Sequence, residues 1–476
     1  MKHFFYKGKT DFLEAKAEET TIDEKIELVK KEFSKVLESR NLSFLIGSGC
    51  SLGPNGIPTM VKLAEAFFEP SEYTLEVMSA ALKELTLSEE SKSVLEAWVI
   101  NHATEPFIKN LETFLGTLYS LRFYLEQIKA DDELEAIDKV IDETKHFILY
   151  QCLNKDNEGK DGSIRENYKN FYRKLSLRDS NLPKPNVFTT NYDLYSEKAM
   201  DELGITYTNG FSGFIERYFN PSIFNYALAE QMDISSFKWN VIDSFIYLFK
   251  IHGSVNWIEV EDSNKLFRIK ELQDSSFEFL KSQKNLMIYP SPIKQNASLG
   301  TPYSDLFREF QKRIARNQSV LVTMGYSFAD EHINNLIYQA LTIPTFRLVI
   351  FSDLGQYSDG AYELLRPNIQ KLKDLNDPRI WIIGSDPEYQ SEAVAKAVEV
   401  VAMPVDEDPM EEEILGAGEE QSELIFTEIN PEKGLFYFST IGTDLLPDWS
   451  ENKIEDQNQK IIQFINSPKN IEEDNQ

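Results

Sequence analysis

Polar residues stand where the sequence pattern predicts the end of a buried strand. The apolar pair Val187-Phe188 is followed by Thr-Thr-Asn-Tyr-Asp at 189–193 and then by the helical pattern LYSEKAMDEL. Tight turns favour Gly or Pro, and this stretch has neither. An amide, a phenol and a carboxylate on a loop held by a strand are typical of a binding or catalytic site. Asn191, Tyr192 and Asp193 are therefore candidate site residues.

Three more strand-like runs end in residues with chemical potential. The run LSFLI leads into Gly-Ser-Gly-Cys-Ser at 47–51, YLFKI leads into His252-Gly253, and VLVTM leads into Gly325-Tyr326-Ser327. A glycine turn lets backbone N–H groups approach a phosphate, and histidine exchanges protons near neutral pH. Ligands of parallel sheets bind beyond the carboxyl ends of the strands. We therefore expect the four stretches to form one site.

Each stretch also has a purely structural explanation. Asp193 is a candidate N-cap of the helix that follows it, and His252 alone is equally explained as a core histidine. We interpret Asp330 as the N-cap of a helix at 330–341 and assign it no further role. The conjunction of four such stretches, each at a strand end, favours the functional interpretation.

The elements around these stretches predict an α/β fold. Apolar strand-like runs alternate with helical patterns, which predicts a doubly wound, mostly parallel Rossmann-like sheet. The runs lie at 42–46, 186–190, 245–253, 285–290, 320–326, 347–351 and 379–383. Nearly all of 61–180 reads as helical and looks like an insertion after the first strand. The predicted parts are 1–60 (an N-terminal helix and the start of the nucleotide-binding domain), 61–184 (helical insertion), 185–404 (remainder of that domain) and 405–476 (acidic appendage).

Composition narrows the function classes. The chain of 476 residues has a net charge of −29, which argues against broad binding to nucleic-acid backbones. No run approaches the roughly 18 apolar residues of a membrane helix, and the first residues lack a secretory pattern, so we expect a cytoplasmic protein. Two cysteines, Cys50 and Cys152, cannot form a four-thiolate zinc site. His3, His102, His146 and His332 show no metal-ligand spacing, so no metal is expected.

About half of the negative charge lies at the C-terminus. From Asp406 to Gln476 there are 19 Asp and Glu against 4 Lys. This segment is predicted to be an appendage rather than part of the core. Within it, LIFTEI and GLFYFST are candidate hairpin strands, and NKIEDQNQKIIQFI resembles a short amphipathic helix.

The order of the motifs resembles the sirtuin family. Sirtuins carry a Gly-Ala-Gly-x-Ser turn, Gly-Ile-Pro, Thr-x-Asn-x-Asp, His-Gly and Gly-x-Ser in this order. The chain has the corresponding residues at 47–51, 56–58, 189–193, 252–253 and 325–327. The likeness is closer to the sirtuin-like domains of bacterial antiphage defence systems, which share Thr-Thr-Asn-Tyr-Asp and His-Gly and hydrolyse NAD. It implies a doubly wound sheet with a helical insertion and NAD bound across the strand ends.

The resemblance also implies roles for individual residues. Asn191 and His252 are the implied reactive pair: Asn191 orients a water, His252 accepts a proton, and Asp193 either bonds the nicotinamide amide or supports the loop. The 47–51 turn is implied to hold the pyrophosphate, with Ser327 and Ser352-Asp353 toward the adenosine. The full set of implied NAD contacts is Gly47, Ser48, Gly49, Ser51, Pro58, Thr190, Tyr192, Gly325, Ser327, Ser352 and Asp353.

Departures from the family bear on the reaction. Protein-deacylating sirtuins carry a four-cysteine zinc module, and their Gly-Ile-Pro continues with Asp-Phe-Arg rather than Thr59-Met60-Val61. The helical block stands in place of the zinc domain that helps to form their acyl-lysine groove. We therefore expect hydrolysis of NAD to nicotinamide and ADP-ribose, the activity of an NAD-depleting defence effector. A sirtuin-type deacylase or ADP-ribosyltransferase and a non-catalytic NAD- or ADP-ribose-binding module stay open as alternatives.

Partners are expected because an ungated NAD hydrolase would kill its host. The helices around FIKNLETFLGTLYSLRFYLEQI carry enough apolar surface for a homo-oligomer contact, although they also suit an ordinary bundle. The resemblance implies a hexameric DNA-translocase-type ATPase as a partner. The acidic tail is expected to affect partner binding more than chemistry.

Overall fold

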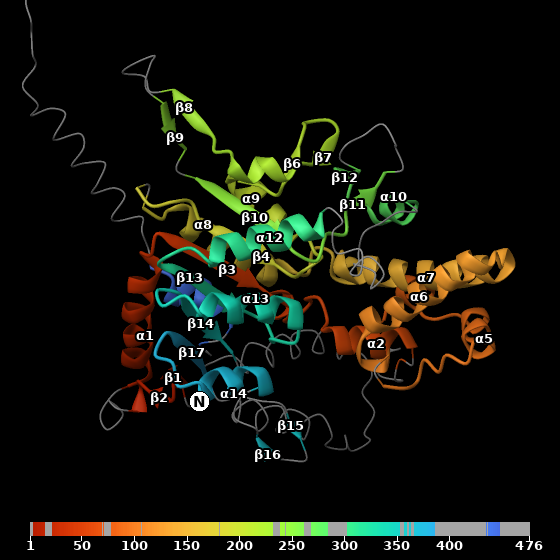
Figure 1. Ribbon diagram of the computed structural model, residues 1–476, viewed down its shortest axis with the longest axis horizontal. Coiled ribbons are helices and arrows are strands. Elements are labelled where there is room, and N and C mark those ends of the chain that lie inside the picture. The colour runs from red at the N-terminus through yellow and green to blue at the C-terminus, as the bar shows by residue number, and fades with distance from the viewer. Residues whose placement is uncertain are drawn as a thin grey trace, which may run out of the picture.

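Nine strands form the central sheet, in the order β2-β1-β17-β14-β13-β3-β4-β10-β5 (Figure 1). Their bounds are β1 His3–Lys7, β2 Thr10–Asp11, β3 Asn41–Ile46, β4 Asn186–Thr189, β5 Thr206–Thr208, β10 Phe245–Lys250, β13 Ser319–Met324, β14 Arg347–Phe351 and β17 Ile380–Ser385. The computed structural model describes residues 3–14, 21–68, 70, 78–105, 107–179, 181–231, 239–242, 244–260, 268–283, 302–352, 357–358, 361–362, 366–385, 435 and 437–447.

The sheet is mostly parallel. Neighbouring strands from β17 to β5 run in the same direction, and among the described residues the antiparallel pairs of this sheet are β1 with β17 and β1 with β2, at one edge. The predicted α/β class with a doubly wound sheet is therefore confirmed. The predicted strands were found except for the run at 285–290, which lies outside the described residues. The short edge strands β1, β2 and β5 were not predicted.

Alternating side chains of the strands fill two cores. In β3, Phe44 and Ile46 face one core and Leu45 faces the other, as expected for the two-residue period of a strand. The first core is covered by α1 Ile22–Leu37, α8 Gly162–Ser176 and α9 Tyr195–Leu203, and the second by α12 Tyr303–Ile314, α13 Glu331–Leu341 and α14 Pro367–Asp374. The sheet thus has helices on both faces.

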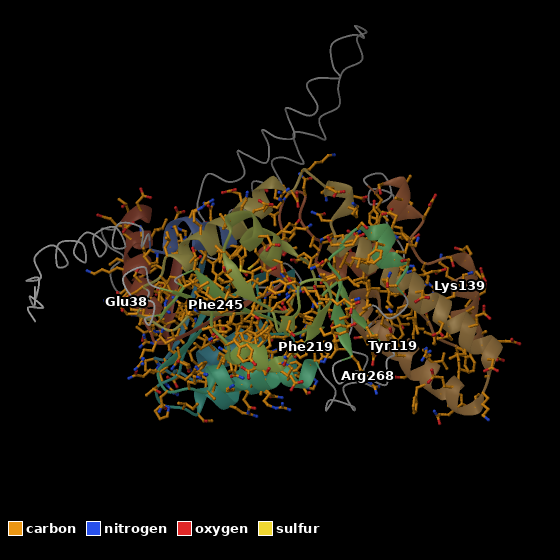
Figure 2. The ribbon with its side chains drawn as sticks, turned by 90° about the horizontal axis from the view of Figure 1, so that it is seen from above. Glu38, Tyr119, Lys139, Phe219, Phe245 and Arg268 are labelled. Atoms are coloured by element: carbon orange, nitrogen blue, oxygen red, sulfur yellow. The ribbon has the colours of Figure 1, made fainter. Side chains whose placement is uncertain are left out.

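The chain between β3 and β4 is helical, as predicted. After the 3₁₀ turn η2 Ser48–Ser51 come α2 Met60–Phe68, α4 Ala80–Lys83, α5 Glu89–Ala97, η3 Phe107–Lys109, α6 Leu111–Ile128, α7 Asp131–Cys152, η4 Lys155–Asn157 and α8. The helices from α2 to α7 share a separate core and lie at one end of the molecule (Figure 1). Figure 2 shows Tyr119 and Lys139 of this region at the opposite end from Glu38, which follows α1. In contrast, α8 packs on the sheet.

Three small sheets, among the described residues, are separate from the central sheet. One contains β6 Phe211–Ser212, β7 Arg217–Phe219, β11 Trp257–Glu259 and β12 Ile269–Glu271. The pairs β8 Ala229–Gln231 with β9 Trp239–Val241 and β15 Tyr357–Ser358 with β16 Ala361–Tyr362 form two hairpin-like sheets. The remaining short helices are η5 Pro221–Asn225 and α10 Phe277–Lys281. In the described part of the chain, no helix is long and apolar enough to cross a membrane.

Part of the C-terminal segment belongs to the core. The stretch expected to form a hairpin strand contains α17 Phe438–Thr440, which continues into the π-helical turn η6 Ile441–Leu445. Leu435, Phe438, Ile441, Leu445 and Leu446 are buried in the first core, and Lys174 of α8 donates to the carbonyl of Leu446 at 2.8 Å. The hairpin prediction is therefore wrong for this stretch, because its apolar spacing suits a helical turn against α1 and α8. LIFTEI, the acidic residues before 435 and the stretch at 452–465 lie outside the described residues.

Candidate functional site

The four predicted strand ends lie side by side. Strands β13, β3, β4 and β10 are adjacent, and their last residues stand in register: Met324 beside Ile46, Ile46 beside Thr189, and Thr189 beside Lys250. Because the strands are parallel, all four following turns leave from the same edge. The expectation that the sheet brings these stretches together is confirmed.

The glycine turn packs tightly against the turn after β13. The N–H groups of Gly47 and Gly49 donate to the carbonyls of Met324 and Gly325, each at 2.9 Å. A Cβ on Gly47 would lie 2.3 Å from the Gly325 oxygen, and Gly325 itself has a φ of +60°. These glycines are therefore required by the close approach of the two turns. Their N–H groups are already bonded, so this structure does not direct those two groups at a phosphate.

Asn191 is buried with one polar atom left without a partner. Its Nδ2 lies 3.1 Å from the Gly47 carbonyl and 3.1 Å from Ser51 Oγ, while its backbone N–H donates to Thr189 Oγ1 at 3.0 Å. The carbonyl of Gly47 can only accept, which fixes the orientation of the amide. The buried Oδ1 then has no hydrogen-bond partner among the described residues. An unsatisfied buried acceptor is costly, so this atom suits a bound water or ligand.

Asp193 points inward. Its Oδ2 accepts from Ser51 Oγ at 2.8 Å, and its Oδ1 accepts from the N–H of Tyr195 at the start of α9 at 3.1 Å. Burial raises the pKa of Asp193, although the charge of Lys250 and these hydrogen bonds oppose the rise. Of the two roles expected for Asp193, the contacts correspond to support of the loop. Ser51 is likewise engaged inside the protein, since its hydroxyl contacts Asp193 and Asn191.

His252 forms a pair with Asp330. Nε2 of His252 lies 2.9 Å from Oδ2 of Asp330. Burial lowers the pKa of His252, but the hydrogen bond to Asp330 and the charges of Glu112 and Asp330 outweigh it, so the pKa is raised. A carboxylate only accepts, so the Nε2 proton is directed at Asp330 and Nδ1 is left as the basic nitrogen of the neutral ring. Asp330 is the predicted N-cap of α13, but its assignment to that role alone is wrong.

Sequence comparison identifies the part of the chain that carries this pair. Residues 185–345 match the SIR2-like domain family. They form a SIR2-like domain. SIR2-like domains use NAD. No curated protein matches the chain.

The matched residues contain three of the four strand ends. Thr189–Asp193, His252-Gly253 and Gly325–Ser327 fall within the SIR2-like domain, and the glycine turn at 47–51 lies before it. The sheet nevertheless places that turn between two parts of the domain. The nucleotide-binding role of the turn remains a prediction.

A buried lysine holds the loop Thr190–Asp193, the site loop, in the SIR2-like domain. Lys250 is fully buried, and its Nζ donates to the carbonyl of Tyr192 at 3.3 Å and to that of Asp193. It also lies 3.0 Å from Oε1 of Glu197 in α9. A buried charge is tolerated only when it is paired and hydrogen-bonded. Lys250 was not among the predicted site residues, although a lysine at the end of an apolar strand was a visible signal.

Tyr168 of α8 contacts Asn191 and Ser51 and packs against aromatic residues of two other elements. The Tyr168 hydroxyl lies 2.9 Å from Ser51 Oγ and 3.4 Å from Asn191 Nδ2. Its ring stacks on Tyr195 at 5.5 Å and contacts Phe438 at 4.9 Å. The C-terminal core segment therefore touches a residue that bonds Asn191 directly.

Apart from Pro58, the remaining described contacts that were predicted lie directly after β3, β4, β13 and β14. Ser48 is exposed in η2, Pro58 precedes α2, and the N–H of Thr190 donates to the carbonyl of Ile46 at 3.1 Å. Ser327 is exposed, and the next residue, Phe328, has a φ of +57°. Ser352 is buried, with its N–H donating to Ile383 at 3.0 Å, and Asp353 lies outside the described residues.

No cluster suited to a metal ion was found in the part of the chain that the structure describes. Burial raises the pKa of Cys152 to about 12, and it also raises that of Cys50. Both thiols are therefore poor sources of the thiolate that binds zinc. Cys50 donates instead to the carbonyl of Met324 at 3.3 Å.

Proposed function

We propose that this protein hydrolyses NAD at the bond between nicotinamide and ribose, and that it acts as the NAD-depleting effector of a bacterial antiphage defence system. The observation that carries the proposal is the buried Oδ1 of Asn191, which has no hydrogen-bond partner among the described residues and lies one strand away from the His252–Asp330 pair. A site that only binds a nucleotide needs neither a histidine–carboxylate pair nor an unsatisfied buried acceptor. A hydrolase uses both: the buried acceptor orients a water, and the histidine–carboxylate pair takes its proton.

Each residue of the site has a separate role in the proposed reaction. Cleavage passes through an oxocarbenium-like state at the ribose carbon, to which a water oxygen bonds as nicotinamide leaves with the bonding electrons. Asn191 Oδ1 accepts a hydrogen bond from that water and holds it in place. His252 takes the proton that the water releases, and Asp330 stabilises the resulting imidazolium. Asp193 and Lys250 keep the loop in position.

Chromatography of the full-length protein with NAD tests the proposal. We expect nicotinamide and ADP-ribose in equal amounts without any added acceptor. Release of nicotinamide only after addition of an acylated peptide would favour the deacylase. Binding of NAD without cleavage under all conditions would favour a binding module.

We also propose that the activity depends on assembly into a homo-oligomer. Phe123, Tyr124 and Ile128 of α6 are 49%, 53% and 52% exposed, although the rest of the helix buries a core face. Exposed aromatic side chains on one helix favour a contact with another chain. Mass measurement in solution for the wild type and for Phe123→Ser/Tyr124→Ser tests this. A monomeric wild type with full activity would contradict it.

A hexameric DNA-translocase-type ATPase is proposed as the partner that gates the enzyme. The net charge of −29 favours a basic protein surface over a nucleic acid as the direct contact. Co-purification followed by NAD hydrolysis with and without the ATPase tests this pairing. Unchanged mass and unchanged turnover on mixing would contradict it.

A further inference from the structure

A carboxylate from the helical region between β3 and β4 contacts the site loop of the SIR2-like domain. Glu112 is the second residue of α6, and its Oε1 accepts a hydrogen bond from the Tyr192 hydroxyl at 3.2 Å. Tyr192 is only 7% exposed, and its ring centroid lies 6.4 Å from that of His252. The Glu112 carboxylate is therefore tied to the residue between Asn191 and Asp193 in the chain.

The start of α6 is held firmly in this position. The Asn110 side chain caps the helix and accepts from the N–H groups of Glu112 at 2.8 Å and Thr113 at 3.3 Å. Leu111 and Phe114 are fully buried in a core that also includes Tyr192. Because the helical region and the site loop share one core, the placement of Glu112 follows from the packing of the two parts.

His252 has two acidic neighbours from different elements. Asp330 of α13 bonds its Nε2 directly, and Glu112 of α6 acts on it through its charge. Burial raises the pKa of Glu112 overall; the charge of His252 and the hydrogen bond from Tyr192 oppose the rise, and the charge of Asp330 adds to it. The positive end of the α6 dipole also favours the carboxylate, since Glu112 lies in the first helical turn.

We infer that Glu112 is a positioning residue of this site: its carboxylate holds the Tyr192 side chain and gives His252 a second negative neighbour. Through this residue the helical region contributes to the chemistry of the SIR2-like domain. The inference rests on the proposed function only where activity is the readout.

The test is a titration of His252 in Glu112→Gln, which keeps the side-chain shape and removes the charge. The C–H signals of His252 in the NAD-free full-length protein are followed by NMR and assigned with His252→Ala. We expect His252 to titrate at a lower pH in Glu112→Gln than in the wild type, because a negative neighbour is lost. Since the neutral imidazole is the proposed base, the acidic limb of the NAD hydrolysis profile moves to lower pH as well.

Two further variants sharpen the result. Glu126→Gln removes the same charge from the same helix, at a side chain that pairs with Arg122. We expect His252 to titrate in this variant as it does in the wild type. Tyr192→Phe removes the hydrogen-bond donor to Glu112 and so disfavours the charged form of Glu112. We therefore expect the titration of His252 to move to lower pH here too, but by a smaller amount. Tyr192→Phe also provides the test if Glu112→Gln does not fold.

The outcomes separate the inference from the proposed function. Identical His252 titration in the wild type, Glu112→Gln and Tyr192→Phe would overturn the inference, whatever the activity. A shifted titration together with no NAD hydrolysis in any variant would support the role of Glu112 and count against the hydrolase.

Discussion

Asp330 bonds residues of two different elements with its two carboxylate oxygens. Its Oδ1 accepts from the N–H groups of His332 and Ile333 at 2.9 and 3.1 Å, and its Oδ2 lies 2.9 Å from Nε2 of His252. One carboxylate thus anchors the start of α13 and orients the imidazole at the end of β10. Burial raises the pKa of Asp330, but the hydrogen bond and charge of His252 and the two N–H groups lower it overall.

Replacing Asp330 with Asn separates these two tasks. Asn is as good an N-cap as Asp, so α13 stays intact, but the charge next to His252 is lost. We expect turnover to fall about 10²- to 10⁴-fold, because the histidine tautomer is no longer fixed. The acidic limb of the pH profile moves to lower pH, since the pKa of His252 falls. Steady-state NAD hydrolysis checks this, with the neighbouring exposed Glu331→Gln as control; equal profiles for the two variants would refute the role of Asp330.

The same pair predicts how stability depends on pH. The pKa of Asp330 is lowered from 3.8 and that of His252 is raised from 6.5. Their contribution is therefore fully present between pH 3.8 and 6.5 and is lost as the pH rises through the raised pKa of His252 or falls through the lowered pKa of Asp330. Urea unfolding at several pH values should show a weaker pH dependence in Asp330→Asn than in the wild type. An unchanged dependence would count against the ion pair.

Removing either member of the proposed reactive pair should abolish most of the activity. Asn191→Ala loses the atom that holds the water, and His252→Ala loses the base, so we expect each to lower turnover about 10²- to 10⁴-fold. Thermal unfolding close to that of the wild type serves as the folding control. Near-normal hydrolysis by His252→Ala would remove that residue from the mechanism.

Lys250 is expected to be essential for folding. Lys250→Met leaves the carboxylate of Glu197 and two loop carbonyls without the buried cation, which we expect to lower the free energy of unfolding by about 3–5 kcal/mol. Urea denaturation measures the loss, and Lys198→Met on the exposed side of α9 is the matched control. The double variant Lys250→Met/Glu197→Gln should recover part of the stability. A single variant as stable as the wild type would show that the ion pair is not needed.

Truncation distinguishes two parts of the C-terminal segment. Ending the chain at Pro404 removes Leu435, Phe438 and the other core residues of this segment, so we expect loss of folding rather than loss of partner binding alone. Ending it at Pro447 should leave the fold and basal turnover intact. Phe438→Ala alone should cost about 3–5 kcal/mol, because the ring is buried against Tyr168. Differential scanning calorimetry of the three variants checks these outcomes; a stable protein ending at Pro404 would contradict the core role.

Local patterns were sufficient to predict the inner strands of the central sheet and the edge where the site lies, but not the short edge strands β1, β2 and β5. The apolar runs of β3, β4, β10 and β13 have the length and the apolar pattern of buried strands. The turns after them contain polar residues that a simple loop does not need. Because parallel strands end at one edge, four short motifs far apart in the chain were enough to predict one site. The same reasoning predicted the helical block between β3 and β4.

The sequence by itself determined the fold class and the candidates Asn191 and His252, because strand periodicity and turn composition are properties of neighbouring residues. Only the tertiary structure decided which groups surround them. The pairing of Asp330 with His252, the hydrogen bond from Tyr192 to Glu112 and the burial of Lys250 join residues from separate elements. An N-cap aspartate or a helix-start glutamate has the same local pattern whether or not it faces a histidine. Those contacts depend on strand order and on how the helices pack, and neither can be predicted from the pattern of neighbouring residues.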